Sequence, residues 1–180
     1  MRKKVVALLL VAIINIVPIL ENPIIAEAAT TSKVAVSSAK KNQASNLVKI
    51  ASKEIGYKEG KKDKTKYGMW YGLQNNPWCA MFVSWCANKA GISKNIIPMH
   101  SACLEGVKWF KKKGLWHGRN YVPKPGDIIY FTKSHVGIVE LVTNGYVNTI
   151  EGNTSNMVAR RHYKLKSPKI LGYGVPKYTK

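Results

Sequence analysis

The segment 135-HVGIVELVTNGYVNTIE-151 decides the fold that we expect for this chain. It holds two apolar runs rich in β-branched residues, from His135 to Val142 and from Tyr146 to Glu151, with Asn144-Gly145 between them. This dipeptide is the strongest short signal for a tight hairpin turn, because both of its residues tolerate a positive φ angle. We therefore expect two antiparallel strands here, preceded by another strand at Ile128 to Phe131.

The hairpin brings polar side chains to the start of its first strand. With a turn of about two to four residues, His135 lies opposite one of residues 152 to 154. Glu151 and Asn153 are two residues apart on one strand face, so either side chain can reach the imidazole. A group that accepts a hydrogen bond from one ring nitrogen would fix the tautomer and leave the other nitrogen for a second partner. The sequence leaves open whether Glu151 or Asn153 makes this contact.

The second partner that we expect for His135 is Cys79. Asn75-Asn76-Pro77 precedes the cysteine with a cap residue and a proline suited to the first helical position. Cys79 then falls in the first turn of a helix that runs to about Lys89, with Gly91 just past its end. Unpaired backbone N–H groups and the positive end of the helix dipole favour a thiolate at this place. A thiol and an oriented imidazole are the groups that a cysteine hydrolase needs.

Four motifs, in this order along the chain, resemble the CHAP domain (cysteine, histidine-dependent amidohydrolase/peptidase). They are Trp78-Cys79-Ala80 with Phe82-Val83-Ser84-Trp85, Pro125-Gly126-Asp127, His135-Val136-Gly137-Ile138-Val139, and Glu151 with Asn153. The resemblance covers roughly Gln43 to Tyr178. It implies an α+β, papain-like CHAP fold with N-terminal helices packed on an antiparallel sheet, and cleavage of amide bonds in peptidoglycan. It also implies that Cys79 is the nucleophile and His135 the base, that Glu151 and Asn153 are the orienting acid and amide, and that no cofactor is needed.

The expected mechanism follows from these roles. The Cys79 thiolate attacks an amide carbonyl and forms a thioester, while His135 protonates the leaving amine and then activates water. The backbone N–H of Cys79 and the side chain of Gln74 are the expected oxyanion donors. The motifs do not separate an N-acetylmuramoyl-L-alanine amidase from a peptidoglycan endopeptidase, and we favour the amidase slightly. The alternatives are a non-catalytic cationic wall-binding domain and a secreted cysteine transpeptidase.

Three aromatic residues near the nucleophile are candidates for stacking on the substrate: Tyr67, Trp70 and Trp78. The first two belong to an expected loop from Tyr57 to Asn76, which leads into the nucleophile helix. The alternative is that these rings cover the hydrophobic core.

The two remaining cysteines, Cys86 and Cys103, either form a disulfide or stay as buried thiols. Cys86 cannot bond to Cys79, because the helical rise between them is about 10 Å. We expect no metal site, because the sequence has no CxxC or HxxxH pair and no acidic residue between Lys64 and Cys79.

The first 28 residues have the composition of a signal peptide. Arg2-Lys3-Lys4 is a basic start, Val5 to Leu20 is an apolar run, and Ala26-Glu27-Ala28 fits a cleavage site. The alternative is an uncleaved anchor helix, but Pro18 and the shortness of the run argue against a membrane-spanning segment. We therefore expect no stable membrane insertion after cleavage. We expect residues 29–42 to be a flexible lead-in and residues 43–180 to be the catalytic domain. This organisation places the protein outside the cell, at the wall.

The chain is strongly basic, with a formal net charge of +20. Removing the leader, with its three basic and two acidic residues, leaves +19. The sequence has no aromatic and basic stripe, zinc-finger spacing or helix-turn-helix pattern, which argues against nucleic acid as a partner. An exported cationic protein instead meets anionic wall polymers, so these and peptidoglycan are the expected partners. We expect the protein to be a monomer.

Overall fold

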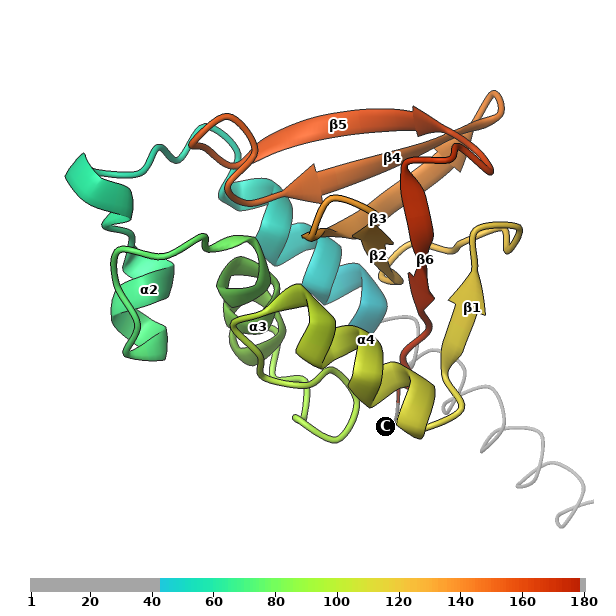
Figure 1. Cartoon of the computed structure of the whole chain (residues 1–180), viewed down its shortest axis with the longest axis horizontal. Coiled ribbons are helices and arrows are strands. Elements are labelled where there is room, and N and C mark those ends of the chain that lie inside the picture. Colours follow the sequence, from blue (N-terminus) through green and yellow to red (C-terminus); the bar gives the residue numbers. More distant parts are fainter. Residues whose placement is uncertain (1–42, 179–180) are drawn as a thin grey trace, which may run out of the picture.

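The computed structural model describes residues 43–178, and Figure 1 shows helices packed against one strongly twisted sheet. A helix over residues 43–53 comes first. The 3-10 helix η1 (Lys61–Asp63) follows, and then α2 (Lys66–Tyr71), α3 (Cys79–Lys89) and α4 (Cys103–Lys112). The strands are β1 (Trp116–Gly118), β2 (Ile128–Phe131), β3 (His135–Thr143), β4 (Tyr146–Glu151), β5 (Ala159–Lys164) and β6 (Ile170–Gly174). These elements confirm the α+β class.

Two sequence predictions fall outside the described residues, namely the signal peptide over residues 1–28 and the lead-in over residues 29–42. Within residues 43–178, no helix has the length and apolar character needed to cross a membrane.

Neighbouring strands of the sheet all run antiparallel, in the order β1-β6-β2-β3-β4-β5. The predicted hairpin is formed by β3 and β4, and Thr143 pairs with Tyr146 across its turn. Asn144 has a φ angle of 50° and Gly145 one of 78°. Both turn residues therefore take the left-handed conformation that a type I′ turn requires, which is why Asn-Gly predicts this hairpin.

The helices cover one face of the sheet and leave a smaller core on the other. Alternate residues of a strand point to opposite faces, so Ile128 and Tyr130 of β2 pack under the helices. Ile129 and Phe131, from the same strand, pack with Tyr173 of β6 in the second core. Helix α3 lies directly on β3, as Figure 1 shows. This packing sets the N-terminus of α3 beside the first residue of β3.

Two details of the helices differ from the sequence prediction. The expected loop from Tyr57 to Asn76 contains α2, whose first turn is capped by the Thr65 hydroxyl accepting from the Gly68 N–H at 2.9 Å. Helix α3 begins at Cys79 with Trp78 as its N-cap, so neither an asparagine cap nor a first-turn proline is used.

Helix α4 has Ala102 as its N-cap and Cys103 as its first residue. A carboxylate oxygen of Glu105 accepts from the backbone N–H groups of both Ser101 and Ala102. The free N–H groups at this end are therefore satisfied by a side chain from inside the helix.

Candidate active site

Cys79 is the first residue of α3, directly after the N-cap residue Trp78. The Trp78 side chain is fully buried, and its indole N–H donates to a carboxylate oxygen of Glu59 at 2.7 Å. Cys79 itself is 5% exposed. Its position in the first helical turn places it among unpaired N–H groups and at the positive end of the helix dipole.

His135 opens β3, directly after Ser134, which has a φ angle of 50°. Its ring packs against the ring of Phe131 on β2, with the centroids 5.6 Å apart. The imidazole Nε2 lies 2.8 Å from a carboxylate oxygen of Glu151. Because this contact uses Nε2 as the donor, Nδ1 is the nitrogen left for the thiol of Cys79.

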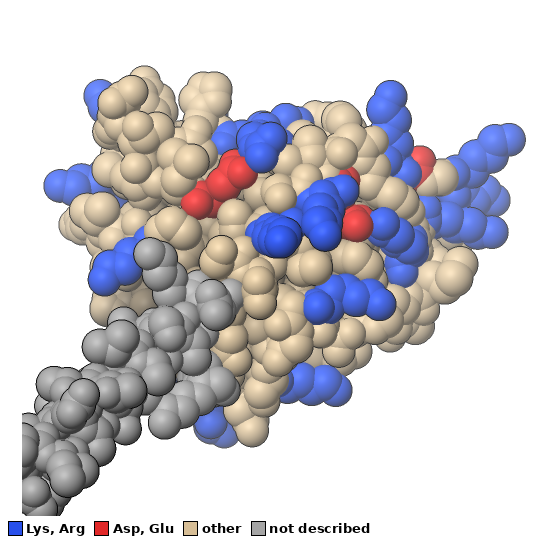
Figure 2. Space-filling view, turned by 180° about the vertical axis from the view of Figure 1, so that it is seen from behind, with Lys and Arg blue, Asp and Glu red and all other residues tan. Residues whose placement is uncertain are grey.

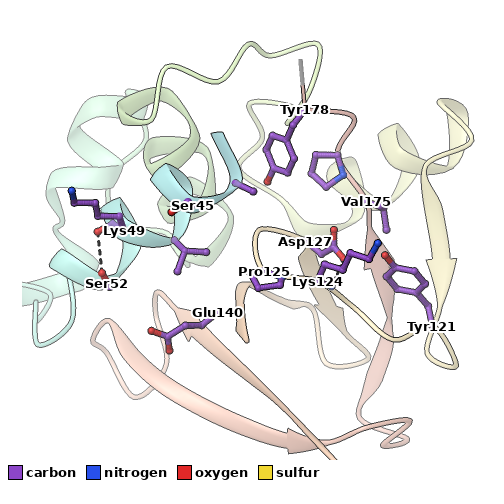
Figure 3. Close-up of a pocket in the computed structure, with 13 residues that line it drawn as sticks. Ser45, Lys49, Ser52, Tyr121, Lys124, Pro125, Asp127, Glu140, Val175 and Tyr178 are labelled. Atoms are coloured by element: carbon purple, nitrogen blue, oxygen red, sulfur yellow. Dashed lines mark hydrogen bonds between the residues drawn. The ribbon is translucent and has the colours of Figure 1, made fainter. Parts of the chain in front are cut away.

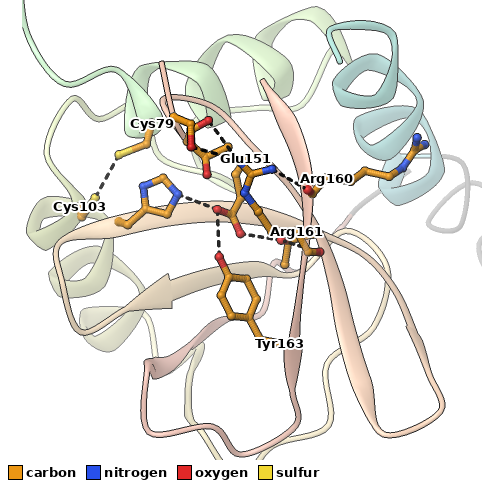
Figure 4. Close-up of polar contacts among 10 residues, drawn as sticks. Cys79, Cys103, Glu151, Arg160, Arg161 and Tyr163 are labelled. Atoms are coloured by element: carbon orange, nitrogen blue, oxygen red, sulfur yellow. Dashed lines mark hydrogen bonds and ion pairs between the residues drawn. The ribbon is translucent and has the colours of Figure 1, made fainter. Parts of the chain in front are cut away.

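Glu151 is the last residue of β4 and is fully buried. Besides His135, its carboxylate accepts from the Thr149 hydroxyl at 2.6 Å and from the Tyr163 hydroxyl at 3.3 Å, as Figure 4 shows. Gly137 makes room for the carboxylate, because a Cβ atom there would lie 2.6 Å from the Cγ of Glu151. The glycine of the HVGIV motif therefore lets the glutamate lie over β3 and reach the histidine.

The sequence suggested that Asn153 shares a strand face with Glu151. In the structure it does not. Strand β4 ends at Glu151, and Asn153 takes a left-handed conformation with a φ angle of 55°. No hydrogen bond joins Asn153 to His135 in the described part of the chain. The structure thus decides the question that the sequence left open, and the carboxylate of Glu151 is the group that contacts the imidazole.

The electrostatic surroundings favour charge on both members of the pair. The pKa of Cys79 is lowered to about 5, chiefly because the Cys103 thiol contacts its sulfur. Burial raises the pKa, but His135 and the Val136 N–H also lower it. Burial lowers the pKa of His135, but Cys79 and Glu151 outweigh it and raise the pKa to about 9. Between these values the thiolate and the imidazolium coexist.

Cys103 is a site residue that the sequence analysis missed. Its Sγ lies 3.7 Å from the Sγ of Cys79, and Figure 4 shows the two side chains pointing toward each other. The neighbouring Cys79 sulfur and burial raise the pKa of Cys103, so Cys79 is the thiol that ionises. All three cysteines are free, and Cys86 is fully buried in the core, so the suggested Cys86–Cys103 disulfide is not present. The signal available in the sequence was that Cys79 and Cys103 each stand near the start of a helix.

Two shallow grooves flank the Cys79–His135 pair. One has a volume of about 370 Å³ and is lined mainly by small and apolar residues, among them Leu73, Pro77, Ala102 and Leu104, together with Cys79. The other has a volume of about 300 Å³ and is lined by His135, Phe131, Thr132, Lys133, Tyr163 and Lys169. Residues 133–135 separate them, so an extended molecule could lie across the reactive pair.

The three aromatic candidates for substrate binding do not line these grooves. Tyr67 and Trp78 are fully buried and stacked on each other, with ring centroids 5.2 Å apart. Trp70 borders a separate small pocket beside α3 that contains neither Cys79 nor His135. For Tyr67 and Trp78 the core interpretation was therefore the right one, because the loop that carries Tyr67 folds over α3.

Gln74, the suggested second oxyanion donor, is engaged elsewhere. Its side-chain amide donates to the Thr65 carbonyl at 3.1 Å and accepts from the Thr65 N–H at 3.0 Å. This pair of hydrogen bonds holds the segment between α2 and α3 in place. The backbone N–H of Cys79 remains the candidate oxyanion donor.

Another cavity, shown in Figure 3, lies away from the pair. It has a volume of about 730 Å³ and lies between the helix over residues 43–53 and the segments around Asp127 and Tyr178. Its lining includes neither Cys79 nor His135. Its buried carboxylate, Asp127, already accepts from the Lys124 N–H at 2.8 Å. We assign no catalytic role to this cavity, because no Cys or His side chain is among the described residues that line it.

The family model of the CHAP domain matches residues 70–153, which include Cys79, His135, Glu151 and Asn153. The match confirms the resemblance that the sequence motifs indicate. Two solved structures of Ly7917 are similar with a TM-score of 0.45 and 15% identity, over 74% of this chain and 62% of each of theirs. One of them is described as being with the hydrolyzing product of MDP. No curated protein matches the chain.

Proposed function

Because residues 70–153 match the CHAP domain, we propose that this protein hydrolyses an amide bond of peptidoglycan with Cys79 as its nucleophile. The observation that carries the proposal is the orientation of His135, whose Nε2 is bound by the buried carboxylate of Glu151 at 2.8 Å. This contact leaves the other ring nitrogen directed to the thiol. Nucleophile, base and orienting acid are thus three side chains in contact, which is the arrangement that thiol hydrolases use.

The reaction begins from an ion pair that exists before substrate binds. The Cys79 thiolate attacks the amide carbonyl, and the oxyanion forms near the backbone N–H of Cys79 at the start of α3. The imidazolium of His135 donates its Nδ1 proton to the leaving amine, which leaves a thioester on Cys79. Neutral His135 then takes a proton from water as the water attacks the thioester. Glu151 keeps Nε2 protonated throughout, so the ring always presents Nδ1 to the reaction.

The surface suits an extended anionic polymer. The two grooves of about 370 and 300 Å³ lie on either side of the reactive pair, so strands of a cross-linked wall can pass across it. Figure 2 shows Lys and Arg side chains spread over one face, with few Asp or Glu side chains among them. The net charge of +20 adds a long-range attraction to anionic wall polymers. Together with the predicted leader over residues 1–28, this supports an enzyme that acts outside the cell.

The test is hydrolysis of purified walls by three variants. Cys79→Ala and Cys79→Ser should abolish the loss of turbidity, because neither supplies a thiolate. Cys86→Ala is the matched control, because Cys86 is a buried thiol on the same helix that touches none of the reacting groups, and it should retain lysis. Lysis by folded Cys79→Ala would refute the proposal and favour a wall-binding domain.

Mass spectrometry of the released fragments identifies the bond. Hydrolysis between N-acetylmuramic acid and L-alanine defines an amidase, and cleavage within the stem or cross-bridge defines an endopeptidase. New peptide links without net addition of water would identify a transpeptidase instead.

A further inference from the structure

Cys79 and Cys103 form a pair of thiols that the proposed hydrolysis does not need. Each is the first residue of a helix, Cys79 of α3 and Cys103 of α4, and their sulfur atoms are 3.7 Å apart. The two residues are 5% and 8% exposed and line the same groove of about 370 Å³. A small molecule that enters this groove therefore meets both sulfur atoms at once.

We propose that Cys79 and Cys103 are the two halves of a reversible disulfide, which removes the nucleophile when it forms. The activity that it would control rests on the proposed function, whereas the cross-link itself does not. A disulfide bond is about 2.05 Å long. Each sulfur must therefore move by less than about 1 Å, which rotation of the side chains about their Cα–Cβ bonds can supply.

The two thiols are unequal in a way that sets the order of events. Cys79 is the thiolate, because it faces His135 and the Val136 N–H, and Cys103 stays protonated beside it. Thiolates react with peroxides far faster than thiols do. Cys79 is therefore the sulfur that is oxidised first, and Cys103 is the sulfur that resolves the product.

A hydroperoxide is the oxidant that completes this chemistry. The Cys79 sulfur attacks one peroxide oxygen, the S–O bond forms, the O–O bond breaks, and the departing hydroxide takes up a proton to become water. The Cys103 sulfur then attacks the sulfenic sulfur of Cys79. The S–S bond forms, the S–O bond breaks, and the second oxygen leaves as water with the Cys103 proton. The two thiols lose two electrons, and hydrogen peroxide is reduced to two waters. A dithiol reverses the change by exchange.

Cys86 cannot replace Cys103 in this reaction. It lies two turns further along α3 and is fully buried. The helical rise between Cys79 and Cys86 is about 10 Å, well beyond the reach of a disulfide. Cys86 is therefore the internal control for any oxidation that depends on proximity to the nucleophile.

The experiment measures the cross-link by mass, independently of wall lysis. Trypsin leaves Cys79 and Cys86 on the single peptide 67–89 and Cys103 on peptide 95–108. The experiment therefore uses Cys86→Ala protein, in which a link between these two peptides can join only Cys79 and Cys103. After addition of equimolar hydrogen peroxide and blocking of free thiols, we expect a loss of about 2 Da and one linked pair of these peptides. Lysis should fall in proportion to the linked fraction, and dithiothreitol should restore both.

The double variant Cys86→Ala/Cys103→Ser, checked by circular dichroism, removes only the resolving thiol. Its Cys79 should pass to the sulfinic and sulfonic acids, with gains of about 32 and 48 Da, and its lysis should not return with dithiothreitol. The proposal is overturned if the protein with Cys103 forms no linked peptide and overoxidises as fast as this variant. A linked peptide in a protein that never lyses walls would uphold the disulfide and reject the proposed function.

Discussion

Replacing Glu151 by glutamine tests the role of the buried carboxylate most directly. The change keeps the size and one accepting oxygen for His135, and the Thr149 hydroxyl can turn to accept from the new amide. What disappears is the negative charge 2.8 Å from Nε2. A hydrogen bond to a charged group contributes about 1.5–3 kcal/mol and a neutral one about 0.5–1.5 kcal/mol. The imidazolium therefore loses about 1–1.5 kcal/mol of stabilisation, while the neutral ring loses little.

The sign of the pKa shift follows from which form loses its partner. Since 1.36 kcal/mol corresponds to one pKa unit, the pKa of His135 should fall from about 9 to about 8. The imidazolium then deprotonates earlier as the pH rises, so the alkaline limb of the pH–rate profile should move down by about one unit. The acid limb, set by Cys79 with a pKa of about 5, should stay in place because His135 remains protonated there.

The assay is the initial rate of wall clearing from about pH 4 to 10 at constant ionic strength. Glu140→Gln is the matched control, because Glu140 also lies on the hairpin but pairs with Arg160 at 2.8 Å. It removes an acidic charge without touching His135, so both of its limbs should match the wild type. An alkaline limb that does not move in folded Glu151→Gln would refute the assignment of this glutamate.

Three further outcomes follow from the structure. Asn153→Ala should lower Tm by a few degrees, because a left-handed alanine costs about 1 kcal/mol, whereas Asn153→Gly should leave Tm unchanged. Lost lysis at unchanged Tm in either variant would restore Asn153 as an orienting residue. Gly137→Ala should cost about 1–3 kcal/mol of stability by overpacking and should displace Glu151. The temperature of unfolding and the alkaline limb of the pH–rate profile should therefore both shift. An unchanged pH–rate profile would contradict the close contact between Gly137 and Glu151. Wall binding of Cys79→Ser, measured by co-sedimentation, should fall steeply as salt shortens the Debye length from about 10 Å at 0.1 M to about 3 Å at 1 M. Binding that resists salt would mean that specific contacts outweigh charge.

The sequence was enough for the hairpin and for the helix that starts at Cys79, because their signals are local. Asn144-Gly145 demands a specific turn, which pairs Thr143 with Tyr146, and the register then shifts once, between Val139 and Leu141, before the strands reach His135 and Glu151. Cys79 carries an equally local signal, since the apolar stripe of its helix and Gly91 mark a helix that starts near the cysteine. These elements needed no knowledge of the rest of the chain.

The remaining site residues depended on packing between distant segments. Tyr67 is in the core only because the segment that carries it folds over α3, which no periodicity in that segment indicates. Cys103 reaches Cys79 only because α3 and α4 start at neighbouring points above the sheet. Asn153 was misplaced because β4 ends two residues before it, and the end of a strand is set by its neighbours.

Strand β5 has a consequence for how copies of the protein would meet on the anionic surface that we propose it binds. It is one edge of the sheet, and its exposed side chains are Arg160, His162 and Lys164. Two copies that paired along this edge would set like charges opposite each other, which is destabilising. The other edge, β1, has only three residues and offers little to pair with. Both are features by which natural sheets avoid joining into larger aggregates. The basic character that we propose concentrates the protein on an anionic surface would thus also keep the concentrated molecules apart.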